Sequence, residues 1–498
     1  MSSRESDFAD QFMESFSADE GDPLQKEKVA WQQQAAVGDY NRKVLDDLLE
    51  DNRTRPVKVT HVNVFGTGDN FRDSFLQKQL KPLLSNNDYL TLEDFLRNVD
   101  LTTTNFTKAG AIRNIGLTLT SPRIKSPYTS ADTLELVANL NVLPVKKFFM
   151  KVGTNVGNGE GDGYLTLQWK NIFGGGELLN FDTNLSSNRI GTKSKSQYLV
   201  SFGTPVNNDP NFKFDAIAYH SSRLIDYTSY QEQAATGLTN RFSTNYLPSE
   251  KKFNHELSFE NLVRSMSMAH SPNNYRGNTL INDYFLLNAG HSLKSSLAYS
   301  LRYDSRNSPI LPRQGHYIKL SSEVSLMPGS RFLKNTLEAT SAHPLTDAAF
   351  LNLNVKSGLI TKYGADAVNP MDKFQFGGPN DMRGFLLSGM GPKQMGMSTG
   401  GDAFFGAGLS LFSKLPFVAK DSDLKMQFFG NVGKLINVTK KTNVLHDLTS
   451  EVDMSVGVGI VYAHPAARFE LNYTLPIVAH SGEDLRRGLQ WGIGLSFL

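Results

Sequence analysis

The feature that most limits how this chain can fold is an alternation of apolar and polar side chains from about residue 146 to the C-terminus. In residues 295–304, SSLAYSLRYD, leucines and tyrosines alternate with serines, an arginine and an aspartate. The same period of two recurs at 317–326, 349–360 and 468–475. Because successive side chains of a strand point to opposite faces, each segment predicts a strand with one apolar and one charged face.

The length of these segments separates a soluble sheet from a membrane-spanning one. Each runs for about ten residues, which is what a tilted strand needs to cross a bilayer, whereas soluble strands average about five or six. Aromatic side chains lie near the segment ends, as interfacial girdles require; examples are Trp169, Phe173, Tyr303, Tyr317, Tyr473 and Trp491. We therefore expect a transmembrane β-barrel over residues 146–498.

Composition agrees with a barrel. Mean hydropathy is −0.33, and the sequence has no run of about 18 apolar residues that would predict a transmembrane helix. About sixteen alternating segments can be counted, and an even number closes an antiparallel barrel. A lumen of that size holds water or a folded-in loop, so the inward polar faces are expected to be solvated. The predicted fold class is mainly β, with a 16-stranded antiparallel barrel preceded by one small α+β domain.

The α+β domain is predicted at residues 55–143. Residues 57–65 alternate as a strand, and residues 70–84 carry one apolar helical stripe. Thr91 opens a second helix as its cap, with an acid three positions later. Strands at 116–120 and 133–142 complete the order β-α-α-β-β.

The first 50 residues give a weaker signal. Residues 1–22 contain seven acidic side chains against one base, Arg4, which fits neither a secretory signal nor a mitochondrial presequence. We interpret them as an acidic tail, followed by helix-forming sequence at 24–50. The formal net charge of +2 gives no indication of nucleic-acid binding.

Motifs for catalysis are missing from the sequence. There is no Walker-type phosphate loop, no G-x-S-x-G and no Cys, and the ten His show no metal-ligand spacing. The glycine-rich stretches 157–163 and 174–176 are interpreted as hairpin turns rather than phosphate loops. We expect no enzyme activity, no cofactor and no metal.

One long loop interrupts the strand pattern, at about residues 363–400, between the eleventh and twelfth predicted strands. Its centre, 375–392, is rich in Gly and Pro, which exclude a regular element, and contains Met382-Arg383-Gly384-Phe385. Loops of this length are usually functional or disordered. We expect this one to fold into the lumen.

Four stretches, in order, match one family. They are Tyr303–Gly315 (Y-D-x-R…P-x-x-G), Arg383-Gly384-Phe385 (R-G-F/Y), Phe429–Gly433 (F-x-D-x-G) and Gly457–Pro476 (the penultimate hairpin). Residues 55–498 thus resemble the outer-membrane barrel-assembly superfamily that includes BamA. The α+β module is similar to its polypeptide-transport-associated (POTRA) domain. A single such domain without a secretory signal most resembles the mitochondrial branch, that of the sorting and assembly machinery.

The resemblance implies an insertase that folds precursor β-barrels into the mitochondrial outer membrane, its amino-terminal domain facing the intermembrane space. Implied clients are the porin and the general translocation channel. Implied partners are metaxin-like subunits, membrane lipids and the inner-membrane contact-site machinery. The implied mechanism opens a seam between the first strand (148–157) and the last (489–498), where a free edge templates a client strand. The candidate seam residues are Phe149, Val152, Gly153, Gly492, Gly494, Leu495 and Phe497.

The residue that Arg383 contacts is left open. In the family its acceptor is the Asp of F-x-D-x-G, and this chain has Asn431 there, so we expect either a neutral hydrogen bond or the participation of another lumen acid such as Glu470. Glycines in the last strand favour a weak seam or relieve crowding in the lumen. The contact of Arg383 either braces the wall or governs the seam.

Two other functions stay open. One is a passive channel. The other is a protein-translocating pore of the plastid or two-partner-secretion type, although the former usually has more transport-associated repeats and the latter a signal. A barrel-linked lipase would need the missing G-x-S-x-G.

Overall fold

The computed structural model describes residues 43, 44, 47, 50–84, 90–122, 133–157, 160–188, 196–225, 231–268, 283–327, 330–363, 368–415, 423–439, 443–464 and 467–494. The chain forms two compact units. One comprises Met1–Gly68, Gln79–Asn105 and Arg113–Leu143, and the other comprises Asp69–Lys78, Phe106–Ile112 and Pro144–Leu498. Nearly all of the predicted acidic tail and helix at 1–50 lies outside the described residues.

The N-terminal part contains a four-stranded sheet in the order β2-β1-β4-β3. Its elements are β1 (Pro56–Phe65), the 3-10 turn η1 (Gly68–Asn70), α3 (Asp73–Leu84), β2 (Leu90–Thr91), α4 (Leu92–Ala109), β3 (Ile112–Thr120) and β4 (Leu134–Pro144). Thr91 caps α4 as predicted, since its Oγ1 accepts from the Asp94 amide at 3.2 Å. Two details differ from prediction. The first helix begins at Asp73 and not at residue 70, because residues 68–70 form the 3-10 turn. The strand β2 was not predicted, because two residues are too few to show an alternation of side chains.

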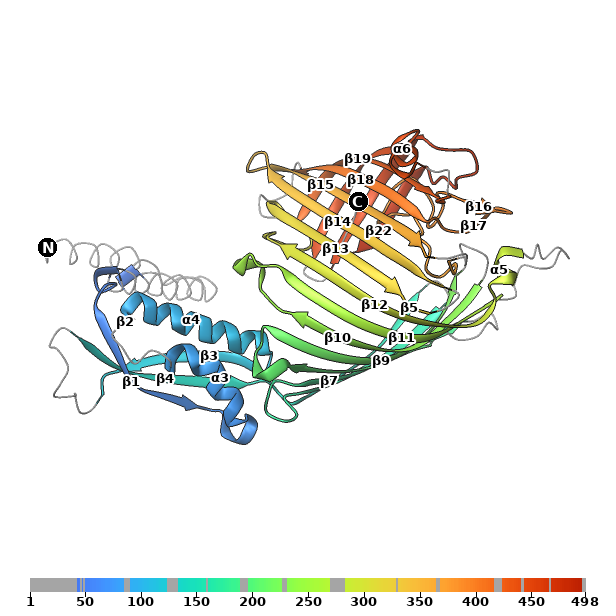
Figure 1. Cartoon of the computed structure of the whole chain (residues 1–498). Coiled ribbons are helices and arrows are strands. Elements are labelled where there is room, and N and C mark those ends of the chain that lie inside the picture. The colour runs from blue at the N-terminus through green and yellow to red at the C-terminus, as the bar shows by residue number, and fades with distance from the viewer. Residues whose placement is uncertain are drawn as a thin grey trace, which may run out of the picture. The chain divides into compact units, whose positions relative to one another are not determined.

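The second unit contains one sheet of sixteen strands, drawn from cyan to red in Figure 1. The strands are β5 (Phe148–Gly157), β6 (Glu160–Lys170), β7 (Leu178–Asn188), β8 (Ser196–Pro205), β9 (Phe212–Ile225), β10 (Gln231–Thr244), β11 (Asn254–Met268), β12 (Gly290–Asp304), β13 (Gly315–Ser325), β14 (Phe332–Pro344), β15 (Ala349–Lys362), β18 (Ala403–Lys414), β19 (Leu424–Ile436), β20 (Asp453–His464), β21 (Ala467–Val478) and β22 (Gly488–Gly494). Each strand pairs antiparallel with its neighbour in this order, which confirms the predicted fold class.

The remaining short elements lie in connections. They are η2 (Val206–Asn208), η3 (Pro248–Glu250), α5 (Asp283–Leu287), β16 (Lys393–Gln394), β17 (Met397–Ser398) and α6 (Val444–Thr449). Residues 171–177 join β6 to β7, so the glycines at 174–176 lie in a hairpin connection, as interpreted from the sequence. Among the described helices, none is long and apolar enough to cross a membrane.

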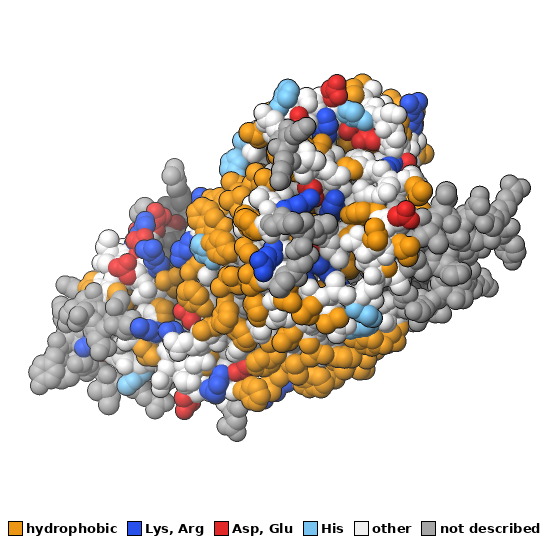
Figure 2. Space-filling model, turned by 45° about the vertical axis from the view of Figure 1, so that its right-hand side comes forward, with side chains coloured by type: hydrophobic (Ala, Val, Ile, Leu, Met, Phe, Trp, Pro, Cys, Tyr) orange, Lys and Arg blue, Asp and Glu red, His pale blue; other side chains and the backbone are white. Residues whose placement is uncertain are grey.

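The two faces of the strands have the chemistry that the alternation predicts. Leu353 of β15 and Leu471 of β21 are 43% and 51% exposed, while Asn352 and Asn472 beside them are buried. In Figure 2 hydrophobic side chains gather into a broad band on the surface in view, as an exterior in contact with lipid requires.

The expectation that inward polar side chains are solvated is wrong for much of this sheet. Gln427, Asn431 and Glu470 are all at most 3% exposed. The physical reason is that other side chains displace water: Arg383 of the connection between β15 and β18 lies against Asn431 and Glu470, and Arg468 of β21 lies against Gln427. A buried polar group must then find a protein partner, because an unsatisfied one costs about 1–3 kcal/mol.

Candidate functional site

The connection between β15 and β18, residues 363–402, is called the lumen loop from here on. It lies between the eleventh and twelfth strands of the sixteen-stranded sheet. Its apolar side chains form one cluster with side chains of β14, β15 and β19: Phe332, Ile360, Val368, Phe374, Phe376, Met382, Phe385, Met390 and Leu435. Burying a side chain of this kind contributes about 1.5–3 kcal/mol, so the cluster fixes the loop against the inner wall.

Acidic residues of the lumen loop bind basic residues of the wall. Asp372 Oδ2 accepts from Arg264 of β11 at 2.7 Å, and its Oδ1 accepts from Lys294 of β12 at 3.0 Å. Asp402 at the end of the loop pairs with Lys362 at 3.0 Å. These pairs join the loop to β11 and β12, which precede its own hairpin, and to the end of β15.

Arg383 lies at the centre of the loop and is completely buried. Its Nε donates to Glu470 Oε2 at 3.0 Å and its Nη2 donates to Glu470 Oε1 at 3.1 Å, which is a two-pronged contact. When the Asn431 amide is oriented with its oxygen toward the guanidinium, that oxygen accepts from Nη1 at 3.2 Å. The structure therefore brings Arg383 to both candidate partners, Glu470 through charge and Asn431 through a neutral hydrogen bond.

Glu470 pairs with a second arginine. Arg468, two residues earlier on β21, also forms an ion pair with Glu470, so two guanidinium groups share one carboxylate. Asn472 donates a further hydrogen bond to Glu470 Oε2 at 2.7 Å. Aromatic rings flank both cations, with Phe429 4.7 Å from Arg383 and Phe412 4.9 Å from Arg468, measured from guanidinium carbon to ring centroid. Cation–π contact with these rings stabilises both guanidinium groups.

The same loop binds the last strand. The Gly384 amide donates to Gln490 Oε1 on β22 at 3.0 Å, and the Asn380 side chain donates to the Ile493 carbonyl at 3.3 Å. The Arg486 amide, in the turn before β22, donates to the Gly384 carbonyl at 2.8 Å. The arginine loop is thus held by β21 through Arg383 and by β22 through its neighbours.

Gly384 is required by this geometry. Its φ is +89°, and a Cβ there would lie 3.2 Å from the Cβ of Ser455 on β20. Only glycine adopts such a φ without cost. The Arg-Gly sequence therefore lets the loop turn while its backbone approaches the wall.

The candidate seam residues occupy the first and last strands, but the structure does not join them. In the described part of the chain β5 pairs with β6 and β22 pairs with β21, and β5 and β22 are the two ends of the sheet order. Phe149 and Val152 are exposed, and Gly153 lies opposite Tyr164 of β6. Leu495 and Phe497 lie outside the described residues.

The two glycines of β22 occupy informative positions. In the register of β21 and β22, Gly492 lies opposite Glu470 and Gly494 lies opposite Arg468. Gly492 is buried, while its neighbour Trp491 is 62% exposed. Because these glycines have no side chains, they leave room beside the ion cluster. This favours the interpretation that they relieve crowding in the lumen, and it is also compatible with a weak seam.

Several residues of this site escaped the sequence analysis. Arg468 and Asn472 share the inward face of β21 with Glu470, and this alternation was the available signal for them. Asp372 had no such signal, because it lies in the loop and its partner Arg264 is 108 residues away in the chain. Gln490 alternates with the apolar side chains of the last strand, but its partner Gly384 is 106 residues away.

A sixteen-stranded antiparallel sheet with an apolar exterior, and with an arginine loop fixed to its inner wall, defines the class of this protein as a membrane β-barrel with a loop-occupied lumen. Residues 171–497 match the Omp85 superfamily domain. The chain belongs to the Omp85 superfamily.

Similar proteins narrow the assignment within that superfamily. A SAM50-like protein of Schizosaccharomyces pombe is 30% identical, over 92% of this chain and 94% of that protein. The sorting assembly machinery 50 kDa subunit of Saccharomyces cerevisiae is 31% identical, over 90% and 96%. The fold is similar to that of BamA from Haemophilus ducreyi lacking POTRA domains 1–3, with a TM-score of 0.66 at 14% identity, covering 88% of this chain and 84% of that one. Together the relatives and the fold point to a mitochondrial outer-membrane barrel with a role in β-barrel assembly.

Proposed function

We propose that this protein inserts precursor β-barrels into the mitochondrial outer membrane through a lateral seam between β5 and β22. The main observation in support of the proposal is the strand pairing of β22. Its only strand partner in the described part of the chain is β21, over seven residues, and the lumen loop holds its inner side. A strand edge without a partner is a template for another chain.

The energetics of such a step need no nucleotide. A client strand that pairs with the edge of β22 gives the backbone groups of that edge ladder hydrogen bonds, as in other cases of strand addition. The outward face of β22 carries Leu489, Trp491 and Ile493, all exposed. An incoming strand with the same alternation continues this apolar face toward lipid.

The placement of the protein in the membrane belongs to the same proposal. We place the N-terminal α+β module in the intermembrane space, where it meets incoming precursors, among them the porin and the translocation channel. Metaxin-like subunits and the inner-membrane contact-site machinery are the proposed partners. The names of the relatives, which refer to sorting and assembly machinery, support membership of such machinery.

Disulfide trapping tests the seam. The chain has no Cys, so one Cys placed in β5 at Val152 and one in β22 at Ile493, with neighbouring pairs as a register scan, form a bond only if the two strands meet. Oxidised protein is expected to stop the assembly of newly imported porin, measured on native gels, and reduction should restore it. A single-Cys variant, treated identically, is the control.

The same assay distinguishes the alternatives. If the locked seam leaves porin assembly at the wild-type rate, the lateral mechanism is wrong. A passive channel predicts ion conductance and normal assembly of other barrels after depletion of the protein. A translocating pore predicts that client chains cross the membrane instead of entering it.

A further inference from the structure

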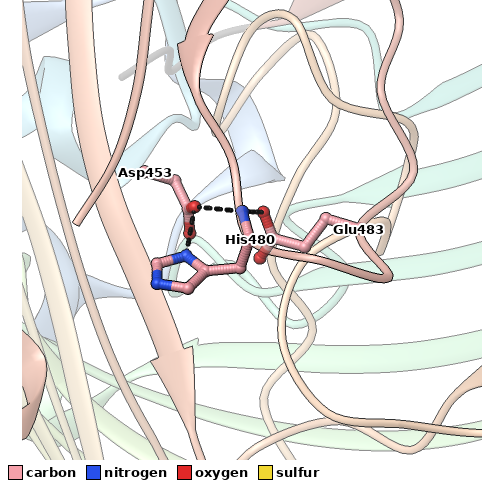
Figure 3. A group of neighbouring side chains, drawn as sticks. All are labelled: Asp453, His480 and Glu483. Atoms are coloured by element: carbon pink, nitrogen blue, oxygen red, sulfur yellow. Dashed lines mark hydrogen bonds and ion pairs between the residues drawn. The ribbon is translucent and has the colours of Figure 1, made fainter. Parts of the chain in front are cut away.

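Three side chains that the lumen-loop site does not include meet at one rim of the sheet. Asp453 is the first residue of β20, and His480 and Glu483 lie in the turn between β21 and β22 (Figure 3). Each offers a ligand atom, and these atoms all lie within 4.8 Å of one another. The sequence analysis predicted no metal, because 27 residues separate Asp453 from His480 and no local spacing shows their proximity.

The cluster differs from the other buried acids of the barrel unit in its counter-charges. Four of those acids each pair with Lys or Arg: Asp215, Asp372, Asp402 and Glu470. Within the described part of the chain, neither Asp453 nor Glu483 has a Lys or Arg partner, although Asp453 is 1% exposed. Two carboxylates this close repel each other when both are ionised. Burial, and then the Asp453 carboxylate, raise the pKa of Glu483 to about 7.

Backbone donors hold the carboxylates in position. The His480 amide donates to Asp453 Oδ1 at 3.1 Å and to Glu483 Oε2 at 3.3 Å. Glu483 Oε1 accepts from the Gly391 amide of the lumen loop at 3.2 Å. The imidazole Nδ1 lies 2.6 Å from Asp453 Oδ1, while its Nε2 faces the exposed carboxylate of Glu451 at 3.8 Å.

We propose that Asp453, His480 and Glu483 form a binding site for a divalent transition-metal ion, with Zn²⁺ as the best fit. One imidazole nitrogen and two carboxylates supply three ligands and two negative charges, and water completes a tetrahedral shell. Such a shell places ligand atoms about 3.3 Å apart, so side-chain shifts of an ångström or so are sufficient. The ion takes the Nδ1 lone pair of His480, and the imidazole proton then resides on Nε2, which faces the Glu451 carboxylate. A ligating His usually donates this second N–H to such a carboxylate. The nitrogen ligand disfavours Mg²⁺ and Ca²⁺.

The position of the site gives the ion a structural consequence. It would tie the start of β20 to the turn that precedes β22, and Gly391 connects this turn to the lumen loop. Metal binding is therefore expected to stabilise the rim beside the last strand. The proposal does not depend on client assembly.

Direct metal titration tests the site. Full-length untagged protein in detergent is stripped with a chelator and titrated with ZnCl₂ against a chromophoric competitor. We expect one Zn²⁺ per chain, and Co²⁺ should give the visible absorption of tetrahedral coordination. His480→Gln and Glu483→Gln should each weaken binding at least tenfold, whereas His446→Gln, an exposed His in α6, should bind like the wild type.

The outcomes separate cleanly. The proposal is overturned if the wild-type protein does not bind Zn²⁺ at one ion per chain, or if both ligand variants bind Zn²⁺ with the affinity of the wild type. Folding of each variant is checked by heat-dependent migration in gels. Because Glu483→Gln preserves shape and removes only the charge, it decides the question if His480→Gln does not fold.

Discussion

Arg383 of the lumen loop and Glu470 of β21 form a two-pronged ion pair, at 3.0 and 3.1 Å, from which solvent is fully excluded. Charge-assisted bonds with this geometry are among the strongest in proteins, and breaking one partner of a buried pair costs about 3–5 kcal/mol. The pair connects the loop to β21, the strand that pairs with the last strand of the sheet. Loss of the pair should therefore affect loop position before it affects the barrel.

Arg383→Ala is expected to release the loop while the barrel still inserts. Porin assembly on native gels should slow several-fold, and the loop should become accessible to protease. Asp381→Ala is the matched control, because Asp381 pairs with Lys356 at 2.9 Å but its side chain is 36% exposed, and such pairs contribute about 0–1 kcal/mol. Wild-type assembly kinetics in Arg383→Ala would show that the contact only braces the wall.

Glu470→Gln should be more damaging than Arg383→Ala. It removes the carboxylate that Arg383 and Arg468 share, whereas Arg383→Ala still leaves Arg468 paired with Glu470. We expect a lower midpoint of thermal unfolding than in Arg383→Ala, measured by heat-dependent gel migration. A lower midpoint in Arg383→Ala than in Glu470→Gln would contradict the role of Glu470 as the shared partner of two arginines.

Asn431→Asp restores the acid that the family motif has at this position. A second carboxylate would then lie beside the guanidinium group of Arg383, so docking of the loop should be stabilised by about 1–3 kcal/mol. A higher unfolding midpoint is the expected reading, with Asn431→Ala as a control that loses the 3.2 Å hydrogen bond. If the midpoint instead falls, desolvation of the new carboxylate outweighs its pairing.

Gly384→Ala should be destabilising for two reasons that a control separates. Its φ of +89° strains an L residue, and its Cβ would crowd Ser455 at 3.2 Å. Gly396 has a φ of +75° with open space around it, so Gly396→Ala measures backbone strain alone. We expect a loss of about 1–3 kcal/mol at Gly384 and a smaller one at Gly396, compared by thermal unfolding. Equal losses would mean that contact with β20 is unimportant.

The sequence by itself determined the class of fold, because a period of two is imposed locally, by the alternation of side chains along each strand. The same local logic located the long loop between the eleventh and twelfth strands and placed Asn431 and Glu470 on inward faces. It also identified the Thr91 cap, since a cap involves only residues three apart.

Tertiary structure decided what those inward side chains meet. Their burial depends on a loop that occupies the lumen, and no property of a single strand reveals that water is displaced there. The sharing of Glu470 by two arginines, and the position of Gly492 opposite it, follow from strand register and loop docking together. The meeting of Asp453 with His480 and Glu483 has the same origin, because the ends of separate hairpins converge only when the sheet has formed.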